Sequence, residues 1–355
     1  LQQLGIKETA IQWFDSYLEN RRQSIIIQDA KSSPRSLDCG VPQGSVLGPV
    51  MFTLYTAPLG TLLSKRGLYH TYADDTMMYL IFKPNQLDNK VRYMEETARI
   101  VRSWMATNSL KMNDSKTEVM LVTPKHLLSK LHCPDLEIGA QVIQPSRTAR
   151  SLGVHFDNQL SMEHHVNTVC RSAYMHLHNL HKIKPYLDNI SLERLIHAFI
   201  TTKLDYGNAV LLGYPQTLLQ KLQRVQNSAA RMLTGTSRYQ HITPVLYDLH
   251  WLPVVQRIHF KVAVLLFKSK NHLAPIYLEE LVQPYVSTRT LRSSDSELLR
   301  VPFTRSSLVA QRAFSVAGPT LWNTLPAELR QCNELTSFKR LLKTFLFKQF
   351  YDSHL

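Results

Sequence analysis

The spacing of apolar residues divides the chain into a mixed first part and a helical remainder. In the first part, apolar residues recur at helical spacing over residues 1–20, 50–59 and 88–107. Runs rich in β-branched and other apolar residues indicate strands at residues 24–28, 68–73, 76–82, 110–113, 118–122 and 151–156. The pattern predicts an α+β fold for residues 1–158, with helices packed on one side of a small sheet.

Beyond residue 160 the pattern becomes helical. An apolar stripe from Leu218 to Leu233 ends at Gly235, which we predict to be a helix C-cap. Further helices are predicted over residues 253–270 and in a last segment that Thr336 would cap. A length of 355 residues predicts two or three domains. We assign residues 159–240 and 241–355 to two helical regions after the α+β part.

Two adjacent acids interrupt the strand pattern in the middle of the first part. Residues 68–73 and 76–82 are typical of a hairpin in which Asp74 and Asp75 form a two-residue loop. Such loops favour Asn-Gly or Asp-Gly, because a positive φ is needed there. A pair of like charges in this place is costly, which favours a divalent cation bound by hard oxygen ligands. An ordinary solvated loop is the alternative.

The net charge of +14 is concentrated in the second half of the chain. Residues 1–160 hold 18 Lys and Arg against 15 Asp and Glu, whereas residues 161–355 hold 23 against 12. The second half therefore carries +11, which favours nucleic acid over a membrane surface as a partner. A generic basic surface is the alternative.

Cysteine usage and hydropathy limit the compartment. Four cysteines lie far apart without paired spacing, which argues against a disulfide framework and for a reducing environment. No secretory signal precedes the first helix, and the longest apolar run is too short to span a bilayer. We expect an intracellular protein, nuclear or cytoplasmic, that is neither secreted nor membrane-bound. Because the chain starts at Leu1 within a helical pattern, we also expect it to be a piece of a longer polyprotein.

Four motifs in order carry a family resemblance. A Gly/Pro-rich stretch at residues 40–49 precedes an apolar helix, as in loops that approach phosphates or bases. The motifs are Gly40-Val41-Pro42-Gln43-Gly44-Ser45, Tyr72-Ala73-Asp74-Asp75, Leu110-Lys111-Met112-Asn113 with Lys116-Thr117-Glu118, and Leu152-Gly153-Val154. This series resembles the reverse transcriptases of LINE-type, non-LTR retrotransposons. The resemblance covers residues 1–235 as palm plus thumb, and parts of the tail are similar to the C-terminal extension of some such elements.

The resemblance implies RNA-templated DNA synthesis from deoxynucleoside triphosphates and a DNA primer. Such polymerases use two Mg²⁺ ions about 4 Å apart, held by converging carboxylates. By resemblance, Asp74 is a direct metal ligand and Asp75 lies beside it. Lys116 corresponds to the lysine that protonates the leaving pyrophosphate, while a plain turn lysine is the alternative.

The same resemblance assigns binding roles to the other motifs. The residues that face the templating base and the incoming nucleotide are Gln43, Gly44 and Ser45. Those under the primer end are Tyr72 and Ala73, with Leu152 and Gly153 as the primer grip.

One departure from the family limits the expected activity. The family takes a further metal-ligating Asp from a strand before the helix at residues 1–20, and this sequence holds no counterpart of that strand or of the fingers. We therefore expect an N-terminally truncated polymerase with a partial palm, inactive by itself. The alternatives are a non-catalytic nucleic-acid-binding remnant and a relative of group II intron maturases. The template RNA and the oligomeric state stay open.

Overall fold

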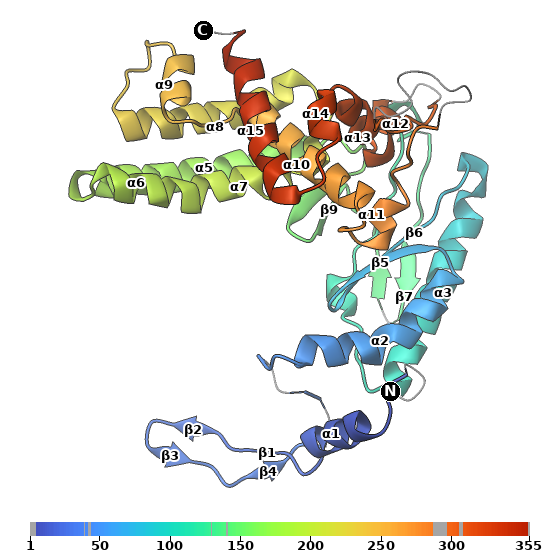
Figure 1. The fold of residues 1–355 in the computed structure, drawn as a ribbon. Coiled ribbons are helices and arrows are strands. Elements are labelled where there is room, and N and C mark those ends of the chain that lie inside the picture. The colour runs from blue at the N-terminus through green and yellow to red at the C-terminus, as the bar shows by residue number, and fades with distance from the viewer. Residues whose placement is uncertain are drawn as a thin grey trace. The chain divides into compact units, whose positions relative to one another are not determined.

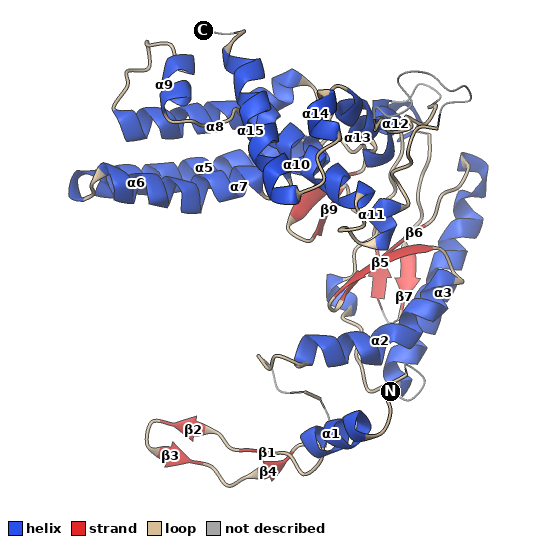
Figure 2. Cartoon of the chain, viewed as in Figure 1, coloured by secondary structure: helices blue, strands red, loops and turns tan. Residues whose placement is uncertain are grey.

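The computed structural model describes residues 5–38, 40–41, 44–128, 130–139, 141–286, 297–304 and 308–353. Among these residues helices predominate, and the strands form five two-stranded antiparallel sheets (Figures 1 and 2). The predicted mixed α+β class is confirmed at this level. The chain forms two compact units, one of residues 1–121 and 125–146 and the other of residues 122–124 and 147–355.

The first unit alternates short helices and hairpins. Its elements are α1 (Thr9–Leu18), β1 (Arg22–Gln23), β2 (Ile26–Ile27), β3 (Ala30–Lys31), β4 (Arg35–Ser36), α2 (Gly48–Ser64), β5 (Leu68–Tyr72), β6 (Asp75–Tyr79), α3 (Leu87–Thr107), α4 (Lys125–Leu128), β7 (Leu136–Ile138) and β8 (Gln141–Ile143). The predicted helices at 1–20, 50–59 and 88–107 correspond to α1, α2 and α3. The pair β7–β8 carries no recognisable pattern in the sequence, because each strand has only three residues.

Two small apolar clusters hold the first unit together. Leu59 and Leu63 of α2 pack with Val101 of α3. At the start of α3, Leu87 and Val91 pack with residues of β7. The stripe on α3 recurs every three to four residues, so the helix presents one continuous apolar face to both clusters. This face positions the hairpin β5–β6, which lies against the first cluster.

Two predictions for the first unit are wrong. Residues 110–113 and 118–122 are not strands; only a 3-10 turn at Asp114–Lys116 lies between them. Without a neighbouring strand to pair with, β-propensity does not suffice to form a ladder. The loop of the acidic hairpin is also displaced by one residue, because Asp75 pairs with Tyr72 and the two-residue turn is Ala73–Asp74.

The second unit is a helical assembly that begins with one hairpin. Its elements are β9 (Thr148–Ser151), β10 (Val154–Asp157), α5 (Glu163–Ile183), α6 (Asn189–Ile196), α7 (Thr202–Asp205), α8 (Gln216–Thr234), α9 (Thr243–Asp248), α10 (Val254–Lys270), α11 (Ile276–Glu279), α12 (Leu308–Arg312), α13 (Phe314–Asn323), α14 (Ala327–Arg330) and α15 (Leu335–Tyr351). A π-helical segment, His197–Thr201, joins α6 to α7.

One hydrophobic core runs through the whole second unit. It includes Val154 of β10, Leu222 of α8 and Phe338 of α15, so residues on both sides of position 240 share it. Helix α10 lies at its centre, with Ile258, Val262 and other residues almost fully buried. Because several elements pack on α10, its buried residues spread beyond a narrow stripe and include most of the apolar run at residues 262–267.

The helix ends follow local capping chemistry. Gly235 ends α8 in the left-handed conformation, as predicted. The predicted cap Thr336 is wrong, since Thr336 lies inside α15 and the Glu334 carboxylate accepts the N–H groups of Thr336 and Ser337. At the start of α5, the Asp157 carboxylate accepts hydrogen bonds from the backbone of Gln159, Ser161 and Met162, and these bonds lower its pKa despite its burial.

Two histidines of the second unit have lowered pKa values, from which we predict that the unit is sensitive to acid. His165 is 3% exposed and accepts a hydrogen bond from the His155 backbone N–H at 3.4 Å, so it is neutral on that nitrogen. Burial, with smaller contributions from His155 and His164, lowers the pKa of His165, and burial lowers the pKa of His259.

As the pH falls below about 6.5, the unfolded chain therefore takes up protons before the folded chain does. We expect the free energy of unfolding to decrease from about pH 6.5 downward, as urea titrations at a series of pH values would measure. His165→Gln should remove part of this decrease. The explanation is wrong if a chain with both His165→Gln and His259→Gln keeps the full pH dependence between about pH 7 and about pH 5.

Candidate active site

The two acids singled out in the sequence lie at the tip of the hairpin β5–β6. Ala73 has a φ of +51°, and Asp74 follows with a negative φ, the sign pattern of a type II′ turn. Asp75 is the first residue of β6 and faces Tyr72 across the ladder. Both carboxylates are exposed. The strained residue is therefore Ala73 and not one of the acids, which leaves both acids free to point toward a ligand.

The two faces of this hairpin differ in character. Tyr69 and Met78 are paired across the strands and pack against the cluster of α2 and α3. The Tyr69 ring lies over Gly60 of α2, where an added Cβ would meet its hydroxyl at 3.1 Å. The opposite face is open and carries Leu68, His70, Tyr72, Asp75, Met77 and Tyr79. The packed face thus anchors the hairpin, and the open face presents aromatic and apolar side chains beside the acids.

The carboxylates fit part of a metal site. Asp74 and Asp75 supply the hard oxygen ligands that Mg²⁺ requires. Within the residues that the structure describes, however, no third His, Cys, Asp or Glu joins them in a group that could hold a metal ion. The pair therefore has the right chemistry and too few ligands for two ions.

The Gly-rich loop leads directly into α2. Gly44 has a φ of +81° and is exposed. The Ser45 hydroxyl accepts a hydrogen bond from the Gly48 N–H at 3.0 Å, which satisfies one of the free donors at the N-terminus of α2. Gln43 lies outside the described residues. Since α2 also carries Gly60, which the Tyr69 ring covers, this one helix connects the loop with the acidic hairpin.

Lys116 ends the 3-10 turn that follows α3. Its side chain is exposed. The turn is held by Asp114, whose carboxylate lies 2.7 Å from the Arg102 guanidinium, and by the Thr117 hydroxyl, which donates to the Asn113 carbonyl at 3.1 Å. These contacts hold the backbone of the turn and leave the Lys116 side chain exposed to solvent.

Leu152 and Gly153 form the tight turn between β9 and β10 in the second unit. Both have positive φ, +45° and +81°, as a type I′ hairpin turn requires. The Tyr206 hydroxyl donates to the Leu152 carbonyl at 2.6 Å. An ideal Cβ on Gly153 would lie 3.0 Å from the Tyr206 ring. Tyr206 therefore fixes this turn, and nothing in the sequence links it with a turn 54 residues earlier.

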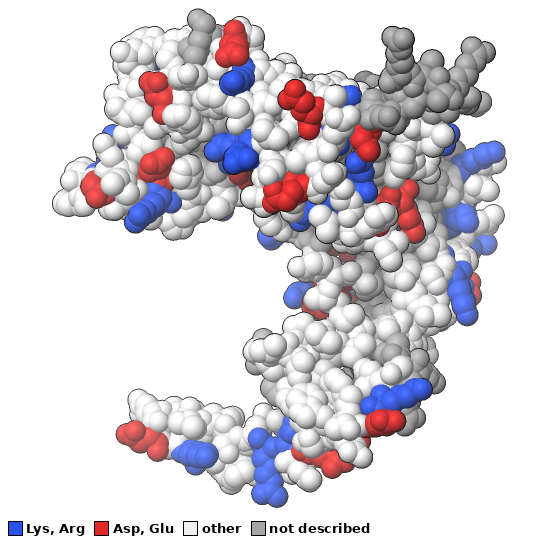
Figure 3. Space-filling model, in the orientation of Figure 1, with Lys and Arg blue, Asp and Glu red and all other residues white. Residues whose placement is uncertain are grey.

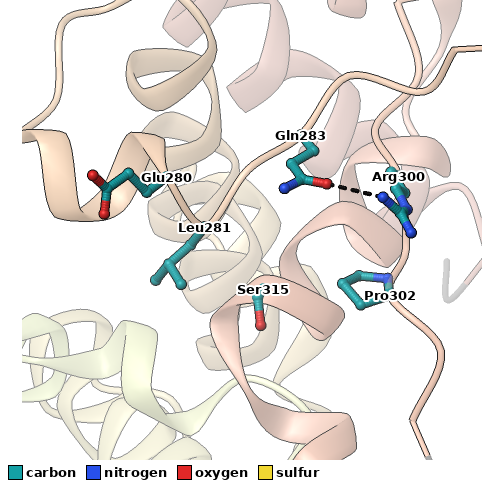
Figure 4. Close-up of a pocket in the computed structure, with 6 residues that line it drawn as sticks. All are labelled: Glu280, Leu281, Gln283, Arg300, Pro302 and Ser315. Carbon is teal, nitrogen blue, oxygen red and sulfur yellow. Dashed lines mark hydrogen bonds between the residues drawn. The ribbon is translucent and has the colours of Figure 1, made fainter.

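One open cavity of the second unit lies apart from these residues. It measures about 270 Å³ and is lined by Glu280, Leu281, Gln283, Arg300, Pro302 and Ser315 (Figure 4). The Arg300 guanidinium donates to the Gln283 amide oxygen at 3.2 Å. None of the predicted site residues lines this cavity, so it has no place in the candidate active site.

Comparison with known proteins decides the family of the first part of the chain. Residues 1–156 match the family model described as reverse transcriptase (RNA-dependent DNA polymerase). Residues 1–156 belong to the reverse transcriptase family. This segment contains α1, the Gly-rich loop, the acidic hairpin and most of the β9–β10 hairpin.

Curated relatives extend the similarity beyond this reverse transcriptase segment. The probable RNA-directed DNA polymerase from transposon BS of Drosophila melanogaster is 29% identical over 68% of the chain and 27% of its own length. The polymerase from mobile element jockey of Drosophila funebris is 23% identical over 67% of the chain and 26% of its own length. The X-element polymerase of Drosophila melanogaster is 24% identical over 72% of the chain and 29% of its own length. The predicted relation to non-LTR retrotransposons is confirmed.

Three further findings complete this description of the chain. The chain spans about a quarter of the length of these relatives. No solved structure matches it. Among the described residues, no helix combines the length and apolar character needed to cross a membrane.

Proposed function

We propose that the chain takes part in RNA-templated DNA synthesis through the acidic turn of β5–β6. The observation that supports this most strongly is an exposed pair of carboxylates at the tip of an anchored hairpin, inside the segment that matches reverse transcriptases. Nucleotidyl transfer needs carboxylates that bind Mg²⁺ near a primer 3′-hydroxyl and an incoming triphosphate. A tight turn can present such groups without burying them.

Each residue of the turn has a role in this proposal. Asp74 binds the metal directly, and Asp75 assists from the first position of β6. Tyr72 and Ala73 lie under the primer end, where the exposed Tyr72 ring offers a surface for a sugar or a base. When bound, Mg²⁺ lowers the pKa of the attacking hydroxyl and neutralises charge on the triphosphate.

The remaining motifs bind the nucleic acid and the nucleotide. Gln43, Gly44 and Ser45 face the templating base and the incoming nucleotide, where a glycine allows close approach of the backbone. Lys116 gives a proton to the leaving pyrophosphate. In the second unit, the rigid turn Leu152–Gly153 grips the primer.

The proposal also assigns regions to the fold. The palm covers residues 1–158, the thumb residues 159–240, and the extension residues 241–355. The thumb and the extension are functional divisions of a unit that shares one core. We further propose an intracellular location, nuclear or cytoplasmic, which agrees with Cys133, Cys170 and Cys332 being free thiols.

The proposed chemistry needs more carboxylates than the described residues bring together. Two ions about 4 Å apart require ligands on several sides, and Asp74 with Asp75 forms only one edge of such a site. We propose that the chain by itself incorporates little or no nucleotide.

A metal-binding measurement tests the acidic turn independently of catalysis. We expect Mn²⁺, added as a paramagnetic substitute for Mg²⁺, to broaden the amide NMR signals of Tyr72 to Asp75 at lower concentration than other signals. Asp29 provides a matched control, because it also lies in an exposed two-residue hairpin turn of the same unit. Asp74→Asn should abolish the preferential broadening of the Tyr72 to Asp75 signals. Equal broadening at the Asp29 turn and the Asp74 turn would contradict the proposal.

Primer extension on an RNA template completes the test. The chain should incorporate nucleotide at background level in the presence of Mg²⁺. Incorporation that Asp74→Asn abolishes and Asp29→Asn does not would support the polymerase reaction and show that the chain needs no further carboxylate.

A second candidate function is binding of nucleic acid without catalysis. The excess of 11 positive charges in residues 161–355 favours it. In that case affinity would fall steeply with salt, and substitutions at Asp74 and Asp75 would leave Mn²⁺ binding and nucleic-acid affinity unchanged.

A further inference from the structure

The last helix of the chain, α15, docks on the second unit through most of its apolar residues, while Leu341 stays 45% exposed. Phe338 and Leu342 are 0% exposed and Leu346 is 1% exposed. The Phe338 ring stacks on Phe267 of α10 with the ring centroids 4.5 Å apart, and on Trp322 of α13 at 5.7 Å. The residues Phe338, Leu342 and Leu346 are thus used in the core and are not available to a lipid bilayer or to the groove of a partner.

Both ends of α15 are held as well. At its start, the Glu334 carboxylate accepts hydrogen bonds from the Ser337 and Thr336 side chains and, more weakly, from their backbone N–H groups, and these bonds lower its pKa to about 2. At its end, the buried Tyr351 hydroxyl donates to the Trp251 carbonyl at 2.7 Å. Hydrogen bonds therefore tie both ends of the helix to their surroundings.

Between the acids at its two caps, Glu334 and Asp352, the charged residues of α15 are all basic. Helix residues Leu335–Tyr351 contain no Asp or Glu. Their four cations are all exposed: Lys339, Arg340, Lys343 and Lys348. None of the four forms an ion pair with any residue that the structure describes. Figure 3 shows basic side chains on the surface over α15.

The spacing of these cations suits a regular polyanion. Lys348, nine residues from Lys339, points about 180° away from it around the helix. Lys339, Arg340 and Lys343 therefore form the closely grouped part of the basic face, and Lys339 and Lys343 are one turn, about 6 Å, apart along the axis. A nucleic-acid duplex carries one charge per about 1.7 Å of its axis, so several phosphates fall within this length. A protein partner is a poorer fit, because lysines are depleted in protein interfaces and this face offers three of them.

We propose that the outer face of α15 is a phosphate-binding surface that holds nucleic acid without reading its sequence. The surface lies in the part of the chain beyond the reverse transcriptase match, to which the resemblance assigns no role. The proposal rests on the proposed function, because that function is the reason to expect nucleic acid as the partner. In this proposal the outer face of α15 holds the primer–template or the copied RNA through charge alone.

A charge-neutralised variant tests the surface. In the full chain, Lys339, Arg340, Lys343 and Lys348 are all changed to Gln, which keeps the exposed positions polar and helix-compatible. The control changes Lys65, Arg92, Lys125 and Lys130 to Gln; these are also three exposed lysines and one exposed arginine, in the first unit. Circular dichroism checks that both variants keep the helical content of the parent chain.

Binding of a short RNA–DNA hybrid duplex and of a single-stranded RNA, both of mixed sequence, is measured by fluorescence anisotropy between about 50 and 300 mM salt. The α15 variant should show a log–log salt dependence for the duplex that is shallower by about 3. Its affinity near 0.1 M salt should be on the order of 100-fold weaker than that of the control variant.

Several outcomes would overturn the proposal. One is an equal loss of affinity for the duplex in both variants, which would reflect net charge alone. Another is an α15 variant whose log–log salt dependence equals that of the parent chain. A third is loss of binding to phosphatidylserine vesicles or to polyglutamate with nucleic-acid binding retained, which would assign the face to a membrane or an acidic protein. The Mn²⁺ and Asp74 measurements do not involve α15, so failure of the proposed function would be seen separately.

Discussion

Replacing Trp322 with alanine is expected to lower the free energy of unfolding of the second unit by about 3–5 kcal/mol. Trp322 of α13 is 0% exposed and its ring stacks against Phe338 of α15. Its indole N–H donates to the Glu297 carbonyl at 2.9 Å. Alanine would leave a cavity between α13 and α15 and would remove this hydrogen bond as well.

Urea titration followed by far-UV circular dichroism measures the effect. Trp322→Phe is the matched variant, since it keeps most of the ring volume and loses the N–H donor, and we expect it to cost about 1–2 kcal/mol. A loss below about 1 kcal/mol for Trp322→Ala would show that the core of this unit collapses around the missing ring. Because Phe338 anchors α15, the same change should also weaken nucleic-acid binding through the proposed phosphate-binding surface.

Replacing Gly153 with alanine is expected to cost about 2 kcal/mol. Two penalties add at this position. Alanine disfavours the φ of +81°, and its Cβ would lie 3.0 Å from the Tyr206 ring. The ring can retreat only by stretching or breaking the hydrogen bond between its hydroxyl and the Leu152 carbonyl.

Gly235→Ala separates the two penalties. Gly235 has a similar φ of +74°, and an added Cβ would meet no atom within 4 Å. Its cost should therefore be that of the backbone alone, about 1 kcal/mol. If the turn Leu152–Gly153 grips the primer as proposed, Gly153→Ala should also reduce affinity for a primer–template, whereas Gly235→Ala should not. Equal costs for the two variants would mean that Tyr206 moves aside freely.

The sequence predicted long helices well and short strands poorly. Helices α3, α8, α10 and α15 each carry an apolar pattern of at least 17 residues, and a periodic signal of this length is hard to mistake. The two-residue and three-residue strands of the first unit are too short for any period. At residues 110–113 and 118–122 the opposite error occurred: strands were predicted from β-propensity, and no strand forms because no neighbouring strand pairs with these residues.

At the candidate active site, the sequence predicted the acidic hairpin but not the position of its turn. Its two strands and the exposure of its acids follow from the residues themselves. The turn position does not, because it depends on Ala73 adopting a positive φ that alanine rarely takes. The cross-strand pairing of Tyr69 and Met78 over the cluster of α2 and α3 selects the register, and with it the turn.

By itself, the sequence determined the helical segments, the order of the four motifs and the family of residues 1–156. These depend on periodicity or on residues close together in the chain, which leave a readable pattern. Only the tertiary structure decided that Tyr206 fixes the turn at Gly153, that residues on both sides of position 240 share one core, and that the basic face of α15 stays free. Each of these arises from packing between residues far apart in the sequence, and such contacts have no period along the chain.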